Sequence, residues 1–174
     1  ALATVLTGGT VVEVGLGLDE GGHTLSSGGS AFLITSAGYL GSMLWGVLLL
    51  AATRQPGPAR GLSVLLGAGV VTAGLGWVRP VASLGFGFTV FAGAVLVALG
   101  IFASHRESRW LLRFVGAFSV LYAFLDIRDD VFLSAGRSDA VILAEITGVP
   151  AIVWGVLWCA VGLLVLRVGW KRLV

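Results

Sequence analysis

Long apolar runs separated by short polar segments dominate the pattern of the chain. Five such runs lie at about 30–52, 62–78, 81–103, 110–127 and 149–168. Most of them are near the roughly 20 residues that a helix needs to cross about 30 Å of hydrocarbon. The pattern therefore predicts an all-α polytopic membrane protein, with five transmembrane helices in a single transmembrane domain over residues 1–174.

The pattern changes near the N-terminus. Over residues 10–28, apolar residues alternate with polar ones or glycine, and Gly21-Gly22 supplies a turn. This alternation predicts a small β-hairpin at the membrane surface. Residues 1–6, "ALATVL", are typical of the tail of a helix, which Gly8 and Gly9 end. We expect the start of that truncated helix to lie upstream of Ala1, so that a complete protein has six crossings.

Small residues and helix-capping residues refine this picture. Only Arg79-Pro80 separates the second run from the third, which predicts a tight helical hairpin. Small residues that recur at every fourth position let helix backbones approach closely. Two of the runs have this spacing: Gly38, Ser42 and Gly46 in the first, and Gly85, Thr89 and Gly93 in the third. Ser138-Asp139 is typical of a helix N-cap, which predicts a short helix over about 140–146.

Composition and charge exclude a soluble domain and assign an orientation. Only 11% of the residues are charged, whereas soluble domains carry about 25%. The net charge of +2 comes from loop arginines, so it does not indicate a nucleic-acid partner. Because basic residues favour the cytoplasmic side, the C-terminus is expected inside, and the hairpin and the acidic loop outside. The cytoplasmic side receives eight basic residues and the outer side three: Arg54, Arg60, Arg106, Arg109, Arg113, Arg167, Lys171 and Arg172, against Arg79, Arg128 and Arg137.

The stretch "LDIRDD" at the end of the fourth run holds the candidate chemistry. Ser119, Tyr122 and Asp126 are spaced by three and four residues, so they share one face of a helix. An ionisable group at membrane depth is costly and indicates a function or a buried partner. The alternative is that Asp126 lies at the headgroup level, capped by Arg128 or solvent. Asp129 and Asp130 fit a solvated loop.

The chain does not contain a complete catalytic site of its own. His23 and His105 are not spaced with a second His or Cys, and the sequence contains no H-E-x-x-H. Cys159 is the single cysteine, so no internal disulfide forms, and it fits a small apolar filler.

The order of the segments resembles a known family. "ALATVLTGG" is similar to the segment after the zinc-binding helix of site-2-protease-like intramembrane metallopeptidases, where the pattern runs H-E-x-x-H-A-L-A-x-x-L-T-G-G and continues into a β-hairpin and a glycine-rich helix. "FLDIRDDVF" and "SDAVILAEITGVPAIVWGVLWCAVGLLVL" resemble the C-terminal region of the bacterial branch. The resemblance covers nearly the whole chain.

This resemblance implies a zinc-dependent hydrolase of the bacterial inner membrane that performs intramembrane proteolysis. In the family two histidines and a carboxylate from a later helix hold zinc, which lowers the pKa of its bound water toward about 7. Asp126 is the best match for that third ligand, and the histidines and the general-base Glu would lie upstream of Ala1. The hairpin would offer an edge strand to an extended membrane-protein substrate.

Two other interpretations stay open at this point. A non-catalytic member of the same fold would act as an accessory or scaffold subunit that docks other membrane proteins. A small transporter or channel would need polar residues on several helices, whereas only the fourth run offers more than Ser and Thr.

Overall fold

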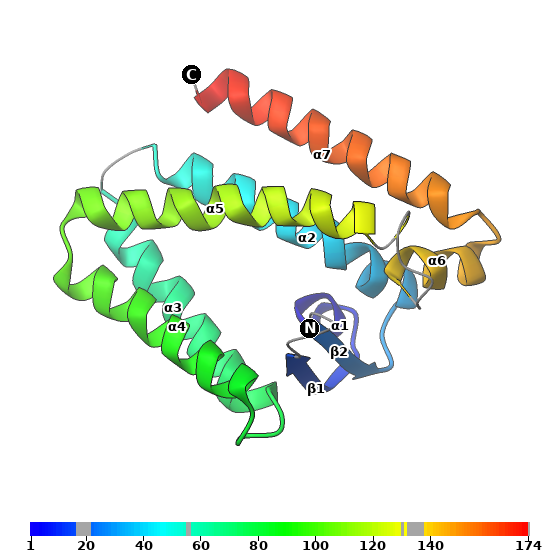
Figure 1. Cartoon of the computed structure of the whole chain (residues 1–174), viewed down its shortest axis with the longest axis horizontal. Coiled ribbons are helices and arrows are strands. Elements are labelled where there is room, and N and C mark those ends of the chain that lie inside the picture. Colours follow the sequence, from blue (N-terminus) through cyan, green and yellow to red (C-terminus); the bar gives the residue numbers. More distant parts are fainter. Residues whose placement is uncertain (17–21, 55–56, 130, 132–137, 174) are drawn as a thin grey trace. The chain divides into compact units, whose positions relative to one another are not determined.

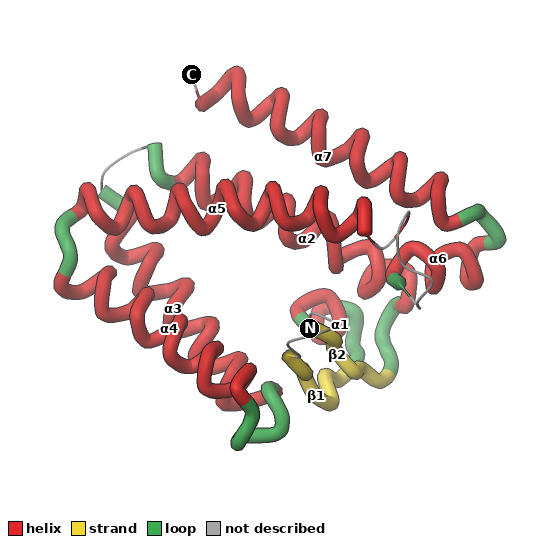
Figure 2. The backbone as a smooth tube through the Cα atoms, in the orientation of Figure 1, coloured by secondary structure: helices red, strands yellow, loops and turns green. Residues whose placement is uncertain are grey.

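The computed structural model describes residues 1–16, 22–54, 57–129, 131 and 138–173. These residues form a mostly helical architecture with one two-stranded sheet, as the sequence predicts (Figures 1 and 2). The elements in chain order are α1 (Leu2–Leu6), β1 (Thr10–Leu16), β2 (Gly22–Ser27), α2 (Ala31–Ala52), α3 (Ala59–Trp77), α4 (Leu84–Phe102), α5 (His105–Arg128), α6 (Asp139–Thr147) and α7 (Ala151–Leu173).

Four helices in the described part of the chain, α2 to α5, are long and apolar enough to cross a membrane. The pair formed by α6 and the first part of α7 passes the same test as a unit, but it is bent by 117° at the break between the two helices. Gly148, in the left-handed conformation with φ 72°, ends α6 at that break. The described residues therefore hold four candidate spans, or five if the bent pair is one span.

The chain divides into two compact units, which are described separately. The first unit is Ala1–Ser30 with Gln55–Leu111, and the second is Ala31–Arg54 with Leu112–Val174. The single transmembrane domain expected from the sequence stays a prediction.

In the first unit, α3 and α4 form the tight hairpin expected from the Arg79-Pro80 connection. Gly67 and Gly93 face each other so closely that a Cβ on Gly67 would lie 2.6 Å from the Gly93 carbonyl oxygen. Near this contact the Ser63 hydroxyl donates a hydrogen bond to the Leu96 carbonyl at 2.8 Å. The small-residue spacing in the third run thus corresponds to backbone contact between two helices.

The β-hairpin is held against the turn between α3 and α4. Strand β1 pairs antiparallel with β2, from Thr10↔Ser27 to Leu16↔Gly22. On its other edge, β1 meets the end of α3, where the Arg79 N–H donates to the Val14 carbonyl at 3.1 Å. Leu16 fills the space left by Gly85 at the start of α4. One edge of β1 is therefore partly occupied, whereas every residue of β2 is exposed.

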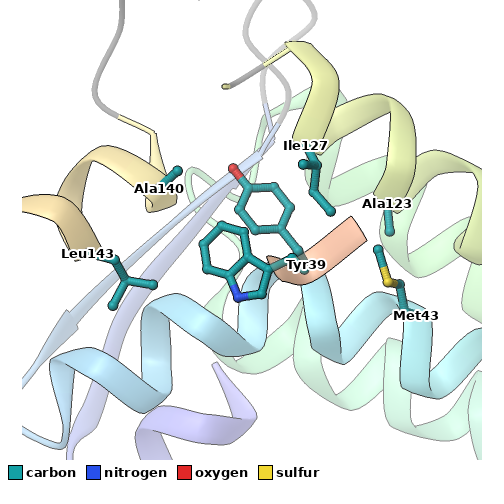
Figure 3. Close-up of a cluster of buried hydrophobic side chains, with 7 residues drawn as sticks. Tyr39, Met43, Ala123, Ile127, Ala140 and Leu143 are labelled. Atoms are coloured by element: carbon teal, nitrogen blue, oxygen red, sulfur yellow. The ribbon is translucent and has the colours of Figure 1, made fainter. Parts of the chain in front are cut away.

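The second unit is built on one buried cluster, which Figure 3 shows. Its seven members come from α2, α5, α6 and α7: Tyr39, Met43, Ala123, Ile127, Ala140, Leu143 and Trp158. Tyr39 packs on Trp158 with ring centroids 4.7 Å apart. Glycine again allows two helices to touch, since a Cβ on Gly46 of α2 would lie 2.6 Å from the Gly116 carbonyl oxygen of α5.

Local hydrogen bonds explain where several helices begin. Ser138 caps α6, as the sequence predicts, by accepting from the Val141 N–H at 3.4 Å. Helix α5 begins at His105, earlier than the expected start near residue 110. The reason is a capping box, in which Glu107 accepts from the Ser104 N–H at 2.7 Å and the Ser104 hydroxyl accepts from the Glu107 N–H at 3.3 Å. Hydropathy alone could not place this start, because the first turn of α5 is polar.

Replacing Gly67 with Ala should destabilise the protein by about 1–3 kcal/mol, because the new methyl group overpacks the contact between α3 and α4. Gly69→Ala on the same helix is the matched control, since no atom lies within 4 Å of a Cβ at Gly69. Thermal unfolding in detergent should show a lower midpoint for the first variant only. Equal midpoints for the two variants would contradict the helix contact.

Candidate functional site

Asp126 lies in the last turn of α5, at the border of that helix's buried face. The face is formed by residues such as Ala123 and Ile127, which are 1% and 0% exposed. Asp126 itself is half-buried and directly precedes Ile127. Asp126 therefore adjoins the second unit's buried cluster along α5.

The polar face expected around Asp126 is divided in the structure. Ser119 is half-buried, and its hydroxyl donates to the Val115 carbonyl of the same helix at 2.8 Å. Tyr122 is 49% exposed, and its ring stacks on Phe118 with centroids 6.2 Å apart. Phe118 stacks in turn on Phe114, so these three rings form an exposed aromatic column. Ser119 and Asp126 share the border of the buried face, and Tyr122 lies beyond it.

The neighbouring acidic residues differ in their partners. Arg128 forms an ion pair with Asp129, with Nη2 and Oδ1 2.7 Å apart. Both side chains are at least half exposed, which fits the solvated segment expected for Asp129. Asp130 lies outside the described residues. Arg128 is thus engaged with Asp129, and the alternative interpretation, in which Arg128 or solvent caps Asp126 at the headgroup level, stays a prediction.

A second carboxylate, Asp139, lies at the same end of the second unit. Asp139 directly precedes Ala140, which belongs to the same buried cluster as Ile127. Its carboxylate lies against Gly38 of α2, at a place that any side chain larger than glycine would fill. In Figure 3 the ring of Tyr39 is seen between Ala140 and Ile127, with its hydroxyl on the side of Ala140. The sequence assigns Asp139 only to the start of a short helix, because the adjacent Ser138 cap conceals this second position.

The histidines lie elsewhere. His23 is on the exposed hairpin, with its Nε2 3.7 Å from Glu13 Oε1 on the paired strand. His105 is exposed at the first residue of α5. Half-buried Cys159 packs against the buried cluster of the second unit, as an apolar filler would.

These positions do not fit a zinc ion by themselves. Within the described ranges, no three His, Cys, Asp or Glu side chains are grouped closely enough to hold a metal ion. A catalytic zinc site normally has three protein ligands, and the 174 residues contain no H-E-x-x-H. A zinc centre that includes Asp126 would therefore need histidine ligands from polypeptide outside this sequence.

Comparison with protein families identifies the class. The family model for Peptidase M50B-like proteins matches residues 1–169. The chain therefore belongs to the Peptidase M50B-like family, and the resemblance to site-2-protease-like proteins is confirmed. Together with the apolar helices, this membership indicates an integral membrane protein of the metallopeptidase type. No curated protein and no solved structure matches the chain.

Proposed function

We propose that this chain forms the membrane-embedded body of an intramembrane zinc metallopeptidase, which cleaves peptide bonds within or near the membrane. The observation that carries the proposal is the family match over residues 1–169, on a chain whose helices α2 to α5 are long and apolar enough to span a bilayer. In this proposal Asp126 supplies one zinc ligand, and polypeptide outside the 174 residues supplies the others.

The position of Asp126 supports this role more than that of any other acidic residue on α5. Glu107 at the opposite end is exposed and belongs to the capping box with Ser104. Asp129 follows the last residue of α5, and its side chain is half exposed. Asp126 is half-buried beside the cluster that contains Ile127, on a helix long enough to cross the membrane. Carboxylates at such depth usually serve a function, because burying the charge is otherwise costly.

Asp126→Ala in the protein expressed from its complete reading frame should weaken zinc binding by about 10–100-fold or more, since even second-shell changes cost that much. Zinc content is measured by mass spectrometry on protein purified without chelators. Asp129→Ala is the matched control, because it removes a carboxylate three residues away that already has an arginine partner. Zinc content that is unchanged in Asp126→Ala, or that falls equally in both variants, would refute the ligand assignment.

Strand β2 is the segment we assign to bind an extended substrate. Strand β1 has β2 on one side and the Val78–Arg79 segment on part of the other. The outer edge of β2 leaves its backbone groups available for strand addition. We therefore expect substrate to bind at the outer edge of β2 and not at the edge of β1.

Amide hydrogen exchange tests that edge. With a cleavable membrane peptide bound to the complete protein, exchange should slow in Gly22–Ser27, because the peptide backbone then accepts hydrogen bonds from that strand. Protection confined to β1, or the absence of any change in the hairpin, would show that substrate binds elsewhere.

We further propose that the C-terminus is cytoplasmic in the bacterial inner membrane, with the hairpin and the acidic segment after α5 on the outer side. Support comes from the distribution of basic residues, eight of which fall on one side of the expected crossings and three on the other.

A protease should therefore remove a C-terminal tag in inside-out vesicles and leave it intact in right-side-out vesicles. Tag digestion is followed by immunoblotting, with a known periplasmic protein as the control for vesicle sealing. Protection in the inside-out preparation would reverse the proposed orientation.

The second candidate function is a non-catalytic accessory subunit of a membrane protein complex. The observation that favours it is a set of glycines on helices α2 to α4 with no atom within 4 Å of an added Cβ, which leaves glycine faces open for docking: Gly41, Gly61, Gly69, Gly76 and Gly87. The two functions differ in a simple measurement. Wild-type complete protein that carries no zinc and co-purifies with a second membrane protein supports the accessory role, whereas stoichiometric zinc supports the peptidase.

A further inference from the structure

Three arginines of the first unit lie at one end of it. Arg60 is in the first turn of α3, close to the C-terminal end of α4, and Arg106 and Arg109 are in the first turns of α5. These three helix ends are neighbours, because α3 and α4 pair antiparallel and only two residues separate α4 from α5. The concentration of positive charge raises the question of which negative group it attracts.

Arg60 already has acceptors within the protein. Its Nε donates to the Gly100 carbonyl at 3.1 Å, and its Nη2 donates to the Ile101 carbonyl. These oxygens belong to the last turn of α4, where no further helical N–H can reach them. Arg60 therefore closes a helix end, and its remaining contribution to this region is its charge.

Arg106 and Arg109 are arranged differently. They are three residues apart on α5 and thus neighbours on one face. Arg106 is exposed, and Arg109 is half-buried. The Nε atom of Arg109 is buried, and the described part of the chain offers it no hydrogen-bond acceptor. Two guanidinium charges therefore adjoin on one face of α5, where a negative group from outside the chain would be attracted to both.

The surroundings of these arginines fit the boundary of a membrane. Phe102 is 85% exposed and Trp110 is 62% exposed, so apolar rings flank the two arginines along the chain. Aromatic rings of this kind favour the headgroup level of a bilayer. Glu107, the acidic residue between the arginines, accepts a hydrogen bond from the Ser104 backbone N–H. The groups that an incoming anion would meet are therefore mainly guanidinium N–H donors and aromatic edges.

We propose that Arg106 and Arg109 bind the phosphate of an anionic phospholipid headgroup, whose acyl chains lie along the apolar surface near Phe102 and Trp110. Guanidinium groups bind phosphate oxygens through short, charge-assisted hydrogen bonds. A lipid brings a negative phosphate to the two guanidinium groups and covers the adjoining apolar surface at the same time. This binding site is independent of the proposed peptidase function, since it involves neither Asp126 nor the hairpin.

The test is a titration of the detergent-solubilised complete protein with short-chain phosphatidylglycerol, followed by native mass spectrometry. Each arginine near an anionic headgroup contributes about fivefold to binding, so Arg106→Gln with Arg109→Gln should weaken it by about 30-fold. The matched control is Arg54→Gln with Arg167→Gln, which removes two exposed arginines from the other unit. Binding to this control should stay within about twofold of the wild type, well below the fivefold contribution of one headgroup-bound arginine.

Other ligands distinguish the lipid from a free anion. Phosphatidylcholine of the same chain length should bind more weakly, and inorganic phosphate should not displace phosphatidylglycerol. Equal losses in both double variants would indicate a general surface charge, and displacement by inorganic phosphate would indicate a phosphate pocket; either result overturns the proposal. If the double variant does not fold, the single variant Arg106→Gln is used, because Arg106 is exposed and its replacement should not prevent folding. Unchanged phosphatidylglycerol binding by that variant rejects the site.

Discussion

The constraint on which this structure depends is that backbone carbonyl groups at helix ends need donors where water is scarce. Three arginines supply these donors at three helices. Arg60 binds carbonyls at the end of α4, Arg79 binds the Val78 carbonyl at 3.0 Å and others in the last turn of α3, and Arg113 donates to the Thr53 carbonyl just after α2. Positive charge is also favourable at the negative end of a helix dipole. Three of the eleven basic residues that indicate membrane orientation are therefore also structural caps.

The packing of the helices within each unit depends on close contact between their backbones. Burial of apolar side chains gains little between helices in lipid, so packing has to come from small residues and short polar contacts. Gly67 against Gly93 in the first unit, and Gly46 against Gly116 in the second, bring helices close enough for carbonyl oxygens to meet a neighbouring backbone. Ser63 shows the consequence, because at this separation its hydroxyl reaches a carbonyl of the facing helix. Larger side chains at these glycines would remove the contact and the hydrogen bond together.

The sequence predicts the kinds of elements better than their partners. Hydropathy and alternation are local properties, so they identify the apolar helices and the hairpin, and the local residue types Ser138-Asp139 identify a helix cap. They place the start of α5 too late, because the polar residues of a capping box carry no hydropathy signal. Pairing is not local: nothing in the sequence near Gly85 or Gly38 indicates that Leu16 or Asp139 fills the space beside it. For the same reason Ser119, Tyr122 and Asp126 could be assigned to one face, but not separated into a buried border and an exposed aromatic column.

The position of Asp126 can be judged by the electrostatics of α5 itself. A carboxylate in the last turn of a helix lies at the negative end of the helix dipole, where it is disfavoured. Asp129 occupies the same region, but its ion pair with Arg128 offsets the cost. In the proposed peptidase, a bound cation beside the last turn of α5 would offset this cost at Asp126, as Arg128 does at Asp129. This is the physical reason for proposing a metal ligand at Asp126, and it applies whichever polypeptide provides the remaining ligands.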